Sequence, residues 1–170
     1  FGLGFAPEGW DVTKEYLKSL GFEEEQLLEA GIIVESKGRS YDRFRNRIMF
    51  PIINQSGYVV GFGGRVMDDS VPKYLNTSES PVFNKSNILF GLNLTKKLRP
   101  LTEIIIVEGY MDVITLYQYG YKNAVASLGT ALTPEQAGLI RRYAGSAIIA
   151  YDGETAGQRA TLRAIDVLTK

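Results

Sequence analysis

The feature that most constrains the fold is a regular alternation of short apolar runs and helical segments after Pro100. The apolar runs are residues 104–107, 123–127 and 146–151, and the helical segments are residues 111–119, 133–143 and 156–169. Strands that alternate with helices in this way pair in parallel through right-handed crossovers. This half of the chain therefore predicts an α/β fold with a mostly parallel βαβαβα sheet.

The first hundred residues follow a different pattern, typical of an α+β subdomain. Helices are predicted at residues 11–20, with Asp11 or Thr13 as the cap, and at residues 23–30. Three β-rich runs, at residues 32–34, 47–54 and 58–66, precede an irregular stretch over residues 67–100 that is limited by three prolines. We predict one domain over residues 1–100 and a second, truncated at its C-terminus, over residues 101–170.

Composition excludes several function classes. The chain has no cysteine and no histidine, so a disulfide, a thiolate zinc site and a histidine-based triad are impossible. Any metal must be bound by oxygen ligands, which points to magnesium, manganese or calcium. No apolar run approaches the ~18 residues of a membrane helix, and no P-loop motif is present.

The net charge of zero conceals an uneven distribution. Residues 1–36 carry two lysines against eight acidic side chains, whereas residues 37–99 carry eleven basic side chains against four acidic ones. A basic middle third indicates a surface that faces a polyanion, unless the two regions simply neutralise each other.

Acidic residues follow two of the three predicted parallel strands. Glu108 follows the first strand, with Asp112 one turn later, and Asp152 and Glu154 follow the third. Ligands of open parallel sheets gather at the carboxyl ends of strands, so these carboxylates are candidates for a divalent-metal site. Each also lies where a helix begins, so capping is an equal alternative.

Basic and aromatic residues concentrate in the middle of the chain. Arg43, Arg45 and Arg47 alternate, which on a strand would place all three on one face in need of anions. Cations interleaved with aromatic residues are typical of single-stranded nucleic-acid binding. The further candidates for binding nucleic acid or nucleotide are Arg65, Lys73, Tyr74, Asn76 and Lys85.

Six segments in order resemble one known family. The motifs Val-Glu-Gly-Tyr-Met-Asp at residues 107–112 and Tyr-Asp-Gly-Glu-Thr-Ala-Gly at residues 151–157 resemble those of Toprim domains, specifically in bacterial DnaG-type DNA primases. The other four are Phe-Gly-Leu-Gly-Phe-Ala-Pro at the start, the segment from Arg43 to Ile52, Gly-Phe-Gly-Gly-Arg with Pro-Lys-Tyr-Leu-Asn, and Ala-Ser-Leu-Gly-Thr.

The resemblance implies template-directed synthesis of RNA primers on single-stranded DNA from nucleoside triphosphates. It implies that Glu108, Asp152 and Glu154 hold Mg²⁺ or Mn²⁺ and that Asp112 supplements them as a catalytic residue. Zinc and the replicative helicase would bind modules outside this segment, and the protein would be cytoplasmic and associated with the replisome, not with a membrane. The family usually has aspartate where Glu154 stands, and it has a further acidic motif downstream of Lys170.

Two other functions remain open from the sequence. Topoisomerases and nucleases share the Toprim motifs, and the ten tyrosines could supply a topoisomerase nucleophile. A non-catalytic nucleic-acid-binding module, with carboxylates that only cap helices, is the second alternative.

Overall fold

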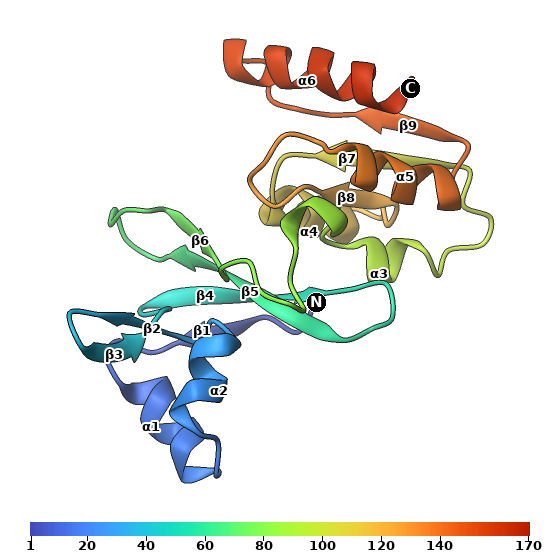
Figure 1. The fold of residues 1–170 in the computed structure, drawn as a ribbon. Helices are drawn as coiled ribbons and strands as arrows, with labels where there is room; N and C mark the ends of the chain where they lie inside the picture. The colour runs from blue at the N-terminus through green and yellow to red at the C-terminus, as the bar shows by residue number, and fades with distance from the viewer. The chain divides into compact units, whose positions relative to one another are not determined.

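The computed structural model describes all 170 residues and divides them into two compact units (Figure 1). The first unit comprises residues 1–52 and 59–83, and the second comprises residues 53–58 and 84–170. By compactness, residues 84–99 belong with the second unit, whereas the predicted domains divide at residue 100.

The side chain of Gln136 explains why residues 84–99 pack there. It is fully buried, and its Nε2 donates to the carbonyl oxygens of Lys85 and Ile88, at 2.9 Å each. A buried amide has to be satisfied, so these bonds fix the segment against the following helix. The irregular stretch predicted there in fact contains a 3₁₀ turn at Lys85–Asn87 and a short helix, α3 (Leu92–Thr95).

The first unit is built on an antiparallel sheet and a separate hairpin. Its strands are β1 (Gly4–Ala6), β2 (Ile33–Ser36), β3 (Arg39–Asp42), β4 (Arg47–Ile53), β5 (Val59–Val66) and β6 (Tyr74–Asn76), and its helices are α1 (Val12–Ser19) and α2 (Glu24–Glu29). The sheet order is β1-β4-β5-β6, and β2 pairs only with β3. The two helices and the long strands match the sequence prediction. The short strands β1, β3 and β6 were not predicted, because segments of three or four residues carry little alternation and form by pairing with a neighbouring strand.

Helix α1 is capped by a residue from a distant strand rather than by the residue before it. Asp11 occupies the N-cap position, but its side chain makes no cap bond. Instead, the carboxylate of Asp42 at the end of β3 accepts the backbone N–H groups of Thr13 and Lys14, at 2.6 and 2.8 Å. Asp42 is 1% exposed, so this interaction is a buried charge-assisted cap.

The second unit is the predicted parallel α/β structure. Its strands are β7 (Glu103–Val107), β8 (Ala124–Ala126) and β9 (Ser146–Ile149), and its main helices are α4 (Tyr110–Gln118), α5 (Pro134–Tyr143) and α6 (Thr155–Leu168). The strand order is β8-β7-β9, and both pairings are parallel. One apolar core runs through this unit, formed by Leu89, Leu92, Ile104, Ile106, Val125, Leu132, Ile140, Ala144 and Ala164. No helix of either unit is long and apolar enough to cross a membrane.

The strand order of this sheet reverses at its first strand. From β7 the chain passes to β8 on one side and then to β9 on the other side, so β7 is central. In open parallel sheets, ligands bind at the carboxyl ends of the strands where the order reverses. That position lies between the ends of β7 and β9.

Substitution of Asp42 tests whether its cap stabilises α1. Asp42→Ala removes the acceptor for two part-buried N–H groups, and we expect it to lower the free energy of unfolding by about 1–2 kcal/mol. Asp69→Ala is the control, because it removes an exposed carboxylate of the same unit that does not cap α1. Urea denaturation of both variants measures the difference, and an equal loss in the two would contradict the assignment.

Candidate active site and nucleic-acid interface

Two acidic residues meet at the point where the sheet order reverses. The parallel pairing of β7 with β9 continues to Ala150, whose N–H donates to the carbonyl oxygen of Ile106 at 2.8 Å. Just beyond this pair, Glu108 Oε1 accepts the backbone N–H of Asp152 at 2.9 Å. The carboxylate that follows β7 is thereby held against the loop that follows β9.

The other two predicted carboxylates differ in what they contact. Asp112 Oδ2 accepts the N–H of Gly109 at 2.9 Å, which closes the first turn of α4 as a helix cap. Glu154 stands at the N-cap position of α6, but its side chain makes no cap bond. Asp112 therefore caps a helix, as the capping alternative expected, whereas Glu154 does not.

The donor set suits a hard divalent cation, although the carboxylates are not gathered around one point. Glu108, Asp152 and Glu154 are all exposed and supply only oxygen donors. No group of three or more acidic side chains in the chain lies close enough together to hold an ion. Since Asp152 and Glu154 are exposed, packing does not oppose rotation of their side chains toward Glu108.

Gly157 is a site residue that the sequence analysis did not single out. It is buried in the first turn of α6, where a Cβ would lie 2.1 Å from the carbonyl oxygen of Asp152. The same Cβ would lie 3.0 Å from Glu108 Oε1. Only glycine therefore allows the helix to approach the loop that carries Asp152 while Glu108 keeps its bond.

Tyr151 lies beside the same carboxylate. Burial, together with the charge of Glu108, raises the pKa of the Tyr151 phenol above its ordinary value of 10.0. The phenol therefore stays neutral throughout the physiological range and adds no charge to the site.

The predicted arrangement of the three alternating arginines is wrong. Strand β4 begins only at Arg47, and Asn46 before it has a φ of 50°, so Arg43 and Arg45 lie in a bend and do not share a strand face with Arg47. A positive φ is incompatible with a continuous strand. The alternation in the sequence therefore does not reflect strand geometry.

These arginines also have partners within the protein, contrary to the expectation that they require anions. Arg43 donates through Nε and Nη2 to the carbonyl oxygen of Asn76, at 3.0 and 2.7 Å. Arg47 is 7% exposed and donates to the carbonyl oxygens of Gly64 and Pro72, at 3.3 and 3.0 Å. Burial lowers the pKa of both guanidiniums. Both side chains hold the segment around β6 in place.

The hairpin of β5 and β6 gathers four of the other predicted residues. Arg65 lies directly opposite Tyr74 in this pairing, and its guanidinium carbon is 5.8 Å from the centre of the Tyr74 ring. Arg65 Nε is buried and has no hydrogen-bond partner. Lys73 is exposed beside them, and Asn76 ends the strand. The remaining predicted residue, Lys85, lies in the second unit.

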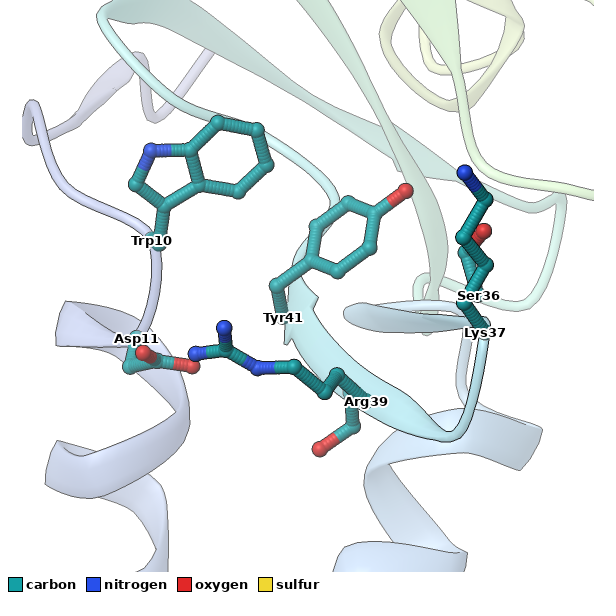
Figure 2. Close-up of a pocket in the computed structure, with 7 residues that line it drawn as sticks. Trp10, Asp11, Ser36, Lys37, Arg39 and Tyr41 are labelled. Atoms are coloured by element: carbon teal, nitrogen blue, oxygen red, sulfur yellow. The ribbon is translucent and has the colours of Figure 1, made fainter.

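A second basic and aromatic site, absent from the sequence prediction, lies between the start of α1 and the β2–β3 hairpin (Figure 2). It is a cavity of about 610 Å³ lined by Trp10, Asp11, Ser36, Lys37, Arg39, Ser40 and Tyr41. The hairpin turn forms because Lys37 and Gly38 both have positive φ, at 52° and 72°. This turn presents Lys37 and Arg39 to the cavity that Trp10 lines from the other side.

Arg45 joins this cavity by stacking on its aromatic residues. Its guanidinium carbon lies 4.2 Å from the ring centre of Trp10 and 5.3 Å from that of Tyr41. The two rings meet edge to face, with centres 5.2 Å apart, and Trp10 remains 62% exposed. An exposed indole beside several cations offers a stacking surface together with positive charge. The aromatic and basic residues around Tyr41 are the only sequence signal for this site.

Alanine substitutions at two glycines test the close approach of α6 to the loop that carries Asp152. We expect Gly157→Ala to lower the free energy of unfolding by about 1–3 kcal/mol, because the new methyl group collides with the Asp152 backbone. Gly153→Ala is the control, since a Cβ there meets nothing within 4 Å. Thermal denaturation of both variants gives the answer, and an unchanged melting temperature for Gly157→Ala would contradict the packing described.

Comparisons with known proteins agree with this architecture. A family model described as the N-terminal domain of the DNA primase catalytic core matches residues 1–96, and a Toprim domain model matches residues 102–170. The DNA primase of Clostridium acetobutylicum is 55% identical over 99% of the chain, and that of Deinococcus radiodurans is 51% identical over 98%. The chain spans 28% and 30% of the length of these two relatives.

Solved structures show the same fold. A DNA primase domain from Pseudomonas aeruginosa superposes with a TM-score of 0.90 at 49% identity, over 99% of this chain and 53% of that one. A DnaG primase catalytic domain bound to single-stranded DNA gives a TM-score of 0.88 at 44% identity, over 98% of this chain and 53% of that one. The chain therefore belongs to the DnaG-type DNA primase family, as an N-terminal catalytic-core domain followed by Toprim sequence.

Proposed function

We propose that this chain acts in template-directed synthesis of RNA primers, as part of a DNA primase that joins nucleoside triphosphates on single-stranded DNA. The observation that carries the proposal is the bond between Glu108 Oε1 and the Asp152 N–H at the order reversal of a parallel sheet. Family membership supports the same reaction, since the solved relatives include a DnaG primase catalytic domain bound to single-stranded DNA.

The acidic residues would hold a divalent cation, Mg²⁺ or Mn²⁺, between the ends of β7 and β9. Glu108, Asp152 and Glu154 are the proposed ligands, because all three are exposed acids that follow β7 and β9 at the same edge of the sheet. The ion would neutralise negative charge on the triphosphate and pyrophosphate. Glu108 orients the loop by accepting the Asp152 N–H, and Asp112 fixes the start of α4 behind it.

The basic residues of the first unit would bind the template and the nucleotide phosphates. Arg65, Lys73 and Tyr74 lie together on the β5–β6 hairpin, where the Arg65 guanidinium lies over the Tyr74 ring. Arg45, stacked on Trp10, adds a surface on which a base can stack. Arg43 and Arg47 would act indirectly, because their guanidiniums bind backbone carbonyls.

If the acidic residues hold a divalent cation, the affinity of the chain for a nucleoside triphosphate should depend on that metal. Asp152→Asn removes the charge while it keeps the shape of the side chain, and we expect it to weaken Mg²⁺-dependent binding of a nucleoside triphosphate at least tenfold, roughly the minimum for a change near a metal ligand. Asp166→Asn is the matched control, because Asp166 is an exposed acid within α6, away from the strand ends. Isothermal titration with and without Mg²⁺ measures the effect, and equal affinity in both variants would refute the site.

A functional assay separates the possible reactions. Incorporation of labelled ribonucleotide on a single-stranded template, abolished by Asp152→Asn, supports primer synthesis. Nicking of a plasmid without incorporation would instead identify a topoisomerase or nuclease reaction. Binding of DNA with neither activity, and without dependence on Asp152, would leave a non-catalytic binding module.

The basic and aromatic cavity predicts a stacking contribution to template binding. Trp10→Ala removes the exposed indole, and we expect it to weaken binding of a single-stranded oligonucleotide by about 1–3 kcal/mol, the range for one stacked base. Trp10→Phe should retain most of the affinity because it keeps an aromatic face. Tyr119→Ala removes a ring that is even more exposed, at the C-cap of α4, and controls for nonspecific loss. Fluorescence anisotropy of a labelled oligonucleotide tests this, and full affinity in Trp10→Ala would exclude stacking there.

A further inference from the structure

Helix α1 is held to the protein in an unusual way for a short helix. None of its eight residues is buried. Polar interactions fix it instead: Asp42 caps its first turn, and the Lys14 ammonium binds Asp11 at 2.6 Å and the carbonyl oxygen of Ser40 at 3.0 Å. Most helices of globular proteins are stabilised by burial of an apolar face, so a helix held by polar bonds leaves its apolar residues available.

The outward side of α1 carries an apolar stripe. Val12, Tyr16 and Leu20 are spaced four residues apart, which places them one above the other on a helix. Their exposed fractions are 46%, 63% and 58%, and Phe22, just after the helix, is 48% exposed. We refer to these four residues as the α1 face. Single exposed apolar residues are common, but three at helical spacing with a fourth directly after the helix indicate an interaction surface.

The segment of the chain that contains the α1 face, residues 1–36, is strongly acidic. Of the eight acidic residues in positions 1–36, Asp11 pairs with Lys14 and Glu24 lies 3.8 Å from Lys18. The other six are exposed and form no ion pair: they are Glu8, Glu15, Glu23, Glu25, Glu29 and Glu35. This excess of acidic charge attracts a basic protein surface.

We propose that the α1 face is a docking site for a basic amphipathic helix of a protein partner. The apolar stripe would receive apolar side chains that recur every three or four residues of the partner helix. The surrounding glutamates would pair with lysine or arginine on the flanks of that helix. The site is distinct from the proposed catalytic and template-binding residues, so the inference does not depend on the proposed reaction.

The probe for this site is a fluorescein-labelled synthetic helix of leucine and lysine with leucines on one face. We expect it to bind the 170-residue chain saturably in an anisotropy titration. Leu20→Ser and Tyr16→Ser should each weaken binding about tenfold, as removal of a central interface side chain does. Both residues are exposed, so melting temperatures should change little. Val82→Ser, which removes an apolar side chain that is 66% exposed elsewhere in the first unit, should bind as the unsubstituted chain does.

A double variant that leaves the stripe intact tests the charge contribution. Glu15→Gln combined with Glu25→Gln should weaken binding and reduce its dependence on salt. The proposal is overturned if Leu20→Ser and Tyr16→Ser both bind with unchanged affinity, since attraction would then be electrostatic alone. It is also overturned if a leucine and glutamate helix with the same leucine positions binds equally well, or if the leucine and lysine helix does not bind.

Discussion

The central position of β7 in its parallel sheet determines where the acidic loop residues of this chain meet. Because β8 pairs on one side of β7 and β9 on the other, the connections leave the carboxyl ends of β7 and β9 open to solvent. The two loops at that edge begin with Glu108 and Asp152, and a single hydrogen bond joins them. This arrangement requires glycine at position 157, because any larger residue would push α6 away from the loop. This arrangement depends on the strand order, on the hydrogen bond from the Asp152 N–H to Glu108 and on the absence of a side chain at Gly157.

In the first unit, charged side chains bind backbone groups of the protein itself. Arg43 and Arg47 hold backbone carbonyls of the segment that forms β6, and Asp42 holds two backbone N–H groups of α1. Charged groups that are partly buried need such partners, since each unsatisfied donor or acceptor costs free energy. The cations that remain accessible, such as Lys73 and Arg39, are those on hairpins and turns.

The sequence predicted the parallel half well and the basic half only in outline. Buried strands such as residues 104–107 carry a continuous apolar run, and their helices carry clear caps such as Thr133, so local signals and tertiary structure agree. The positions of the acidic residues at the strand ends followed from the predicted order of strands and helices alone. The arginine alternation failed because the positive φ of Asn46 breaks the strand, and the sequence does not encode that bend locally. The cap from Asp42 and the cavity beside Trp10 depend on contacts between distant segments, which single-sequence patterns do not reveal.

The cap from Asp42 has a consequence for how the first unit folds. Its partners Thr13 and Lys14 lie 29 and 28 residues away in the chain, so the helix gains its first-turn acceptor only after that loop has closed. A short helix with no buried residue is unstable alone, which makes α1 a late-forming element that depends on β3. Its amide protons should therefore exchange with solvent at the rate set by opening of the β2–β3 hairpin, so the helix and the hairpin would behave as one cooperative unit.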